Sequence, residues 1–104
     1  MYKRQLHARD GMHISTSLIR TPQLQLLRLV LPPGHALPRH QVPGEATIHC
    51  LAGEAGIATR VASLRLVAGS VVLVPAGEPH DVHARGEQGC VLLVTVTMQP
   101  PPPE

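Results

Sequence analysis

The sequence almost lacks aromatic residues. Among its 104 residues Tyr2 is the single aromatic side chain, and neither tryptophan nor phenylalanine occurs. Single-stranded nucleic acids bind largely by stacking their bases on aromatic rings, so this mode of binding has almost nothing to use. The formal net charge is only +2, and no run of basic residues stands out. We therefore expect no nucleic-acid partner.

Cysteines are few, and long apolar runs are missing. Cys50 and Cys90 lie far apart, which fits neither a disulfide framework nor a paired zinc signature. No apolar run approaches the roughly twenty residues that a membrane-spanning helix needs. The basic segment Met1 to Asp10 does not lead into an apolar stretch, as a signal peptide would. We therefore expect a cytoplasmic protein that has no membrane partner.

What the sequence does contain is aliphatic side chains in short runs. It has 14 Leu, 11 Val and 4 Ile, and glycine and proline separate the runs from one another. The runs are 24–31, 46–51, 57–61, 63–67, 70–74, 81–84 and 90–97. Short, β-branched runs at near-regular spacing predict an all-β protein, an antiparallel sandwich or barrel. We expect an N-terminal arm over 1–16, a β-barrel domain over 17–98 and an extended proline-rich tail over 99–104.

One segment carries a motif with five residues at fixed spacing. Gly69 to Ala84, GSVVLVPAGEPHDVHA, reads G-x5-P-x-G-x2-H-x3-A. It resembles the second motif of the cupin superfamily, which has Asn in place of the final Ala. Upstream, the segment from Gly34 to His40, followed later by Gly53, resembles the first cupin motif. The resemblance covers roughly 24–97 and implies a small jelly-roll β-barrel of the RmlC-like kind.

The resemblance also implies a metal site, which this sequence matches only in part. In metal-binding cupins, two His and one Glu of the first motif join one His of the second motif around a divalent ion. Here His40 matches the first of these positions and His80 matches the last. The second His position is occupied by Val42, and the Glu position falls on Ala46. The site is therefore degenerate or absent by default.

Several side chains could still supply a third ligand. Glu45 neighbours Ala46 and would point to the opposite face of a regular strand, unless the turn at Pro43 and Gly44 shifts the register. The other candidates are His35, His49 and His83, for each of which an exposed or hydrogen-bonded histidine is the simpler interpretation. If an ion binds, the resemblance points to iron, manganese, nickel or zinc.

Other reactive residues have simple structural explanations. Cys50 is most simply a small buried side chain, and Cys90 is structural, because neither has a neighbour expected to activate a thiolate. The adjacent His80 and Asp81 resemble an acid–base couple. Successive side chains on a strand diverge, however, so Asp81 is expected to be a surface charge.

Two functions follow from these residues. The first is a single-domain cupin that binds a small molecule in an aliphatic barrel pocket, with His40, His80 and Arg39 as the polar residues that orient it. The expected pocket residues are Val42, Ala46, Ile48, Cys50, Leu73, Val82 and Leu93. The alternative is a metal-dependent enzyme, an oxygenase or isomerase, in which His40 and His80 bind the ion with Glu45 or another His. The direction of the Glu45 side chain discriminates between the two.

A homodimer is expected with either function. Small cupins commonly pair through sheet edges, and the arm before Leu24 and the strand over 24–31 supply edge material.

Overall fold

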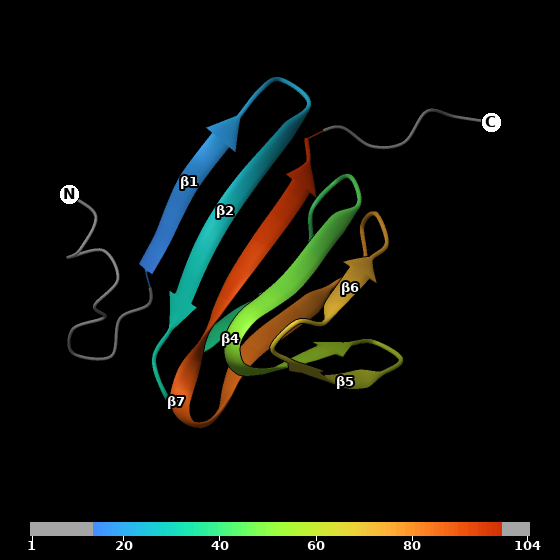
Figure 1. Cartoon of the computed structure of the whole chain (residues 1–104). Coiled ribbons are helices and arrows are strands. Elements are labelled where there is room, and N and C mark those ends of the chain that lie inside the picture. The colour runs from blue at the N-terminus through green and yellow to red at the C-terminus, as the bar shows by residue number, and fades with distance from the viewer. Residues whose placement is uncertain (1–13, 99–104) are drawn as a thin grey trace.

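Two long strands organise the fold. The computed structural model describes residues 14–98, and in this range it contains seven strands and no helix (Figure 1). The strands are β1 (Ile14–Arg20), β2 (Leu24–Leu31), β3 (Ala36–His40), β4 (Ala46–Thr59), β5 (Ser63–Val67), β6 (Val71–Val74) and β7 (His80–Thr97). The all-β prediction is therefore confirmed. The described residues include no helix that could cross a membrane.

Strands β4 and β7 pair with each other in antiparallel fashion along almost their whole lengths. The C-terminal half of β7 also pairs with β2, and its N-terminal half pairs with β3. Strands β5 and β6 pair with opposite halves of β4. Each long strand is thus shared between the two layers of the barrel, and Figure 1 shows β7 passing from one layer to the other at the lower end.

The bend between the layers depends on glycine. Gly53 on β4 pairs with Cys90, whereas the next residue, Glu54, pairs with Arg85, so residues 86–89 of β7 have no partner on β4. Gly53 has a φ of 75°, which is unfavourable for residues with a Cβ. A Cβ at this position would overlap the carbonyl oxygen of Gly89. The two strands approach each other closely here because no side chain separates them.

The same glycines explain where the strands differ from the expected runs. Run 46–51 and residues 57–59 of the next run belong to one continuous strand, β4, and runs 81–84 and 90–97 belong to β7. Glycine was expected to end these strands, but here it bends them without ending them. Strand β1 begins at Ile14, within the segment expected to be an arm, and β3 lies outside the expected runs.

The core follows the two-residue period of the strands. Leu29 on β2, Leu92 on β7 and Cys50 on β4 occupy one register row, and all three are buried. Neighbouring rows point alternately inward and outward, as the pleat requires. Burial of a Leu or Ile side chain stabilises the fold by about 1.5–3 kcal/mol. The core is built entirely of aliphatic residues and the two cysteines, plus His80 as its single polar member within residues 14–98.

Candidate functional site

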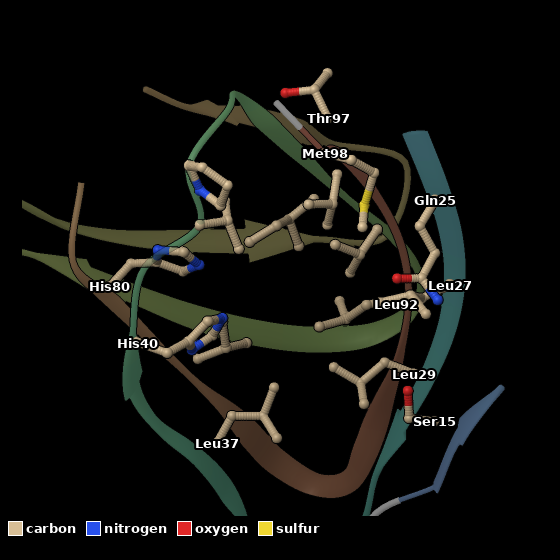
Figure 2. Close-up of a pocket in the computed structure, with 16 residues that line it drawn as sticks. Ser15, Gln25, Leu27, Leu29, Leu37, His40, His80, Leu92, Thr97 and Met98 are labelled. Carbon is tan, nitrogen blue, oxygen red and sulfur yellow. The ribbon is translucent and has the colours of Figure 1, made fainter. Parts of the chain in front are cut away.

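A cavity of about 380 Å³ lies inside the barrel (Figure 2). Most of the cavity wall is aliphatic, and strands β2, β4 and β7 contribute most of it. These apolar residues include Leu27 and Leu29 from β2, Ile48 from β4, and Leu92, Val94 and Val96 from β7. The polar side chains in the described wall are Ser15, Gln25, His40, His80 and Thr97. The cavity is therefore an apolar space with a few polar groups on its wall, as in many small-molecule sites.

The two histidines lie together on one wall of the cavity. His40 ends β3 and His80 begins β7, and the two residues are direct partners in the β3–β7 pairing. Their ring centroids are 4.4 Å apart and the rings are tilted by 54°. His80 is only 3% exposed, whereas the His40 residue is exposed at the rim.

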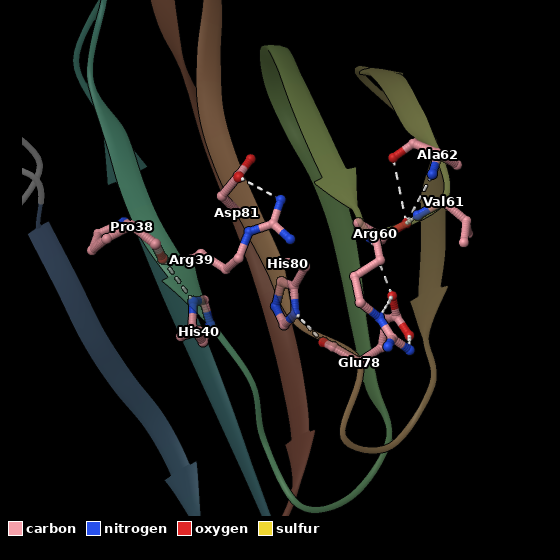
Figure 3. Close-up of polar contacts among 10 residues, drawn as sticks. Pro38, Arg39, His40, Arg60, Val61, Ala62, Glu78, His80 and Asp81 are labelled. Carbon is pink, nitrogen blue, oxygen red and sulfur yellow. Dashed lines mark hydrogen bonds and ion pairs between the residues drawn. The ribbon is translucent and has the colours of Figure 1, made fainter.

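The hydrogen bonds of these rings fix their orientation. The Nδ1 atom of His40 lies 3.1 Å from the carbonyl oxygen of Pro38, and that of His80 lies 3.0 Å from the carbonyl oxygen of Glu78 (Figure 3). The loop before β7 is in turn anchored to the wall, because the Gly77 amide donates to the carbonyl oxygen of Val42 at 2.9 Å. The second motif thus positions His80 and also Val42, which occupies the place of the missing histidine.

The position of Glu45 decides whether the metal site implied by the resemblance is complete. Glu45 is exposed and does not line the cavity. Its carbonyl oxygen accepts two hydrogen bonds from Thr97, from the amide and from the hydroxyl, both at 2.9 Å. Ala46, at the Glu position of the motif, is buried but carries no ligand atom. The turn at Pro43 does not bring the carboxylate into the barrel.

The other candidate ligands, His35, His49 and His83, lie outside the cavity. His35 uses Nδ1 to contact the carbonyl oxygen of Pro33 at 3.0 Å. His49 shares a register row with Leu93 and Arg28, which alternates with the inward rows. The ring of His83 lies against Gly56.

The donor set therefore does not fit a metal ion. Within residues 14–98 no group of three His, Cys, Asp or Glu side chains is arranged to hold a metal. His40 and His80 alone supply two protein ligands, fewer than the three or four of most tight sites.

Five of the seven expected pocket residues lie on the inward face of the barrel. Val42, Ile48 and Val82 line the cavity. Ala46 and Cys50 are buried in the core but do not reach the cavity.

Leu73 and Leu93 do not line the cavity, contrary to expectation. Leu73 is 54% exposed, and it pairs with Thr47, in a row that faces away from the interior. Leu93 pairs with His49 in another outward row, next to the inward residue Leu92. In both cases the adjacent residue on the strand faces inward, so the side chains of Leu73 and Leu93 face away from the cavity.

Most of the wall contributed by β1, β2 and the end of β7 is absent from the expected pocket residues. The polar residue Arg28 between Leu27 and Leu29 was a signal that could have placed these two leucines on one apolar face. Gln25 and Ser15 had no comparable signal, because their positions depend on the pairing of β1 with β2.

The cysteines do not form a reactive site. Burial raises the pKa of the Cys90 thiol to about 11, with a further contribution from nearby Cys50. Burial likewise raises the pKa of Cys50, which a hydrogen bond with the backbone of Ala52 only partly offsets. Raised thiol pKa values disfavour the nucleophilic thiolate.

Charged side chains form ion pairs outside the cavity. Asp81 pairs with Arg39 at 3.3 Å, so it does not form a couple with His80, and Arg39 is not in the cavity wall. Arg60 pairs with Glu78 at 3.1 Å (Figure 3), and this partner holds the pKa of Glu78 below its usual range.

A second group of ion pairs lies where the barrel bends. Glu54 accepts hydrogen bonds from both Arg65 and Arg85. These two arginines hold the pKa of Glu54 below its usual range, the contribution of Arg65 being the larger.

Comparison with known proteins agrees with this architecture. Residues 27–96 match the family described as "Cupin domain". The fold is similar to that of a cupin superfamily protein from Desulfitobacterium hafniense, with a TM-score of 0.81, 24% identity, and coverage of 89% of this chain and 84% of that one. It is also similar to a protein from Thermus thermophilus, with a TM-score of 0.82, 23% identity and 96% coverage of each chain. An RmlC-like cupin from Methanocaldococcus jannaschii has a TM-score of 0.78 at 20% identity, with coverage of 90% and 88%. No match was found among curated proteins.

Proposed function

The chain belongs to the cupin domain family and has its jelly-roll barrel, and we propose that it binds a small, largely apolar molecule in the barrel cavity. The observation that carries this proposal is the cavity itself, an aliphatic space of about 380 Å³ with two adjacent histidines on its wall. Its volume falls within the range typical of small-molecule sites.

The residues at the degenerate motif positions favour an apolar occupant. Val42 lines the cavity where the motif of metal-binding relatives has a histidine, and Ala46 is buried where the motif has a glutamate. Both changes remove polar atoms from the interior. An apolar group that enters this space gains about 25 cal/mol for each Å² of apolar surface removed from water.

The same residues argue against a role that depends on a bound ion. Two imidazoles without a carboxylate or a third imidazole are a weak donor set, so the proposal assigns His40 and His80 to the ligand itself. Their ring centroids lie 4.4 Å apart on the cavity wall, and the two rings orient the ligand that the aliphatic surface binds.

The test uses two matched substitutions on neighbouring residues of β7. Val94→Phe adds a ring to the cavity wall, whereas Leu93→Phe adds bulk to the opposite face of the same strand. Binding of 1-hexanol is measured by isothermal titration calorimetry, after circular dichroism has shown that both variants fold. We expect Val94→Phe to weaken binding at least tenfold and Leu93→Phe to leave it within about twofold. Equal affinities in the wild type and both variants, or no binding to the wild type, would contradict the proposal.

A further inference from the structure

The two cavity histidines use the same ring nitrogen to contact the protein. In each ring Nδ1 is hydrogen-bonded to the carbonyl oxygen two residues earlier, Pro38 for His40 and Glu78 for His80 (Figure 3). A carbonyl oxygen can only accept, so the proton of each bond resides on Nδ1. A neutral imidazole carries one proton. The Nε2 atom of each neutral ring is therefore an acceptor with a free lone pair.

Neither Nε2 has a hydrogen bond to any residue in the part of the chain that the structure describes. For the buried residue His80 this would be costly if the atom were sealed in the core. The only sealed and unpartnered side-chain nitrogen or oxygen among residues 14–98 is Nε of Arg28. The Nε2 atom of His80 thus remains accessible from the cavity, whose wall includes both rings (Figure 2).

The described cavity wall contains no side chain with a fixed charge. It includes no Asp, Glu, Lys or Arg, and its other polar members are two hydroxyl groups and the amide of Gln25. That amide already donates to the hydroxyl of Ser17 at 3.0 Å. An ionised head group would enter without a permanent counter-charge and would lose its hydration, which is unfavourable in an apolar space.

From these contacts we propose that the His40–His80 pair selects a neutral aliphatic ligand whose head group donates hydrogen bonds, such as a primary carboxamide or an alcohol. The two Nε2 atoms are acceptors on one wall, and the aliphatic body lies against the leucines and valines of β2 and β7. A carboxamide has two N–H donors on one nitrogen and can serve both rings. This inference rests on the proposed function, because it names the ligand class of the same cavity.

The first experiment compares four ligands with similar aliphatic tails. Hexanamide and 1-hexanol donate hydrogen bonds, 2-heptanone is neutral and only accepts them, and hexanoate is an anion that only accepts them. Affinities are measured by calorimetry at pH 8, where free imidazole is neutral. We expect hexanamide and 1-hexanol to bind roughly tenfold more tightly than 2-heptanone, since the ketone leaves acceptors unpaired. Hexanoate should bind most weakly of the four.

Variants then assign the selectivity to the rings. His80→Phe and His40→Phe each retain a planar ring and remove the acceptor. In either variant the affinity for hexanamide should fall toward that for 2-heptanone, while the affinity for 2-heptanone stays within about threefold of wild type. His40 is exposed, so His40→Phe tests the inference even if substitution of the buried His80 impairs folding. Unchanged selectivity in a folded variant would overturn the assignment.

The tautomers can be measured without a ligand. Long-range ¹H–¹⁵N correlation spectra of the imidazoles at pH 8 distinguish a proton on Nδ1 from one on Nε2. We expect the Nδ1-protonated form for both rings, and a proton on Nε2 of either would overturn the inference.

The outcomes also separate the two proposals. If all four ligands bind equally, or hexanoate binds most tightly, the cavity is a binding site but the donor-head inference is wrong. If none binds to the wild type, both are wrong.

Discussion

The close approach of β4 and β7 at Gly53 offers a prediction whose size can be worked out from the structure. Gly53 and Gly77 have almost the same backbone conformation, with φ values of 75° and 74°. Their surroundings differ. A Cβ at Gly77 would meet no atom within 4 Å, whereas a Cβ at Gly53 would overlap the carbonyl oxygen of Gly89 and lie 2.9 Å from the Cα of Cys90. Alanine at the two positions therefore separates conformational strain from steric overlap.

The strain common to both substitutions is that of an alanine at positive φ, which costs about 1–2 kcal/mol. For Gly77→Ala we expect a loss of this size in the free energy of unfolding and no more. Gly53→Ala adds an overlap with main-chain atoms, which cannot be relieved by a side-chain rotation. The two long strands would have to separate where their register shifts. We therefore expect Gly53→Ala to lose about 3 kcal/mol or more, in the range reserved for severe core disruptions.

Urea unfolding followed by circular dichroism gives both values, with the wild type as reference. The wild type, Gly77→Ala and Gly53→Ala should unfold at successively lower urea concentrations. If both variants lost only about 1–2 kcal/mol, the close approach of β4 and β7 at Gly53 would be refuted. If both lost about 3 kcal/mol or more, strain and not overlap would account for both losses.

Other perturbations test the thiols, the ion pairs, the alternation and the edge of the sheet. The pKa of Cys90 is raised from about 9.0 to about 11, so between these pH values the folded protein keeps a proton that the unfolded chain loses. The stabilisation from this thiol should therefore be fully present below pH 9, and the free energy of unfolding should fall by up to about 2–3 kcal/mol as the pH rises toward 11. Urea titrations at several pH values should show a smaller fall for Cys90→Ala. The two arginine partners of Glu54 lower its pKa, so its contribution to the free energy of unfolding is present above the ordinary Glu pKa and is lost as the pH falls through the lowered value. Glu54→Gln should therefore make the free energy of unfolding depend less steeply on pH at acidic pH. Leu92→Ala, at a side chain with no exposed surface, should cost about 2–5 kcal/mol in chemical unfolding, and Leu93→Ala on the outward row should cost clearly less. Removal of residues 1–13, which precede the edge strand β1, should lower the dimer fraction in light scattering at micromolar concentration, and an unchanged mass would count against the dimer.

The fold could be predicted from local patterns in the sequence. Aliphatic runs broken by glycine and proline indicated an all-β protein, and the motif from Gly69 to Ala84 pointed to the cupin barrel. The spacing of the same motifs singled out His40 and His80, which the structure brings together as partners. These properties depend on residue type and separation along the chain, and both are directly readable in a sequence.

The boundaries and faces of the strands were less predictable. A glycine in a run has the same local meaning whether it ends a strand or bends it, and only the pairing of β4 with β7 makes Gly53 a bend. Alternation shows that Leu92 and Leu93 face opposite sides, but not which of them faces inward. The inward face is the one that the second layer of the barrel covers, and this is set by the pairing of distant strands.

The sequence by itself thus determined the class of fold, the aliphatic character of the interior and the loss of two metal-ligand positions, Val42 and Ala46. Tertiary structure alone decided that Glu45 stays outside the cavity, held where Thr97 binds its carbonyl oxygen, and that both cavity imidazoles direct Nδ1 to the backbone. The physical reason is that a side chain's chemistry is local, whereas its direction and its hydrogen-bond partners are set by strands that are distant in the sequence and meet only in the folded barrel.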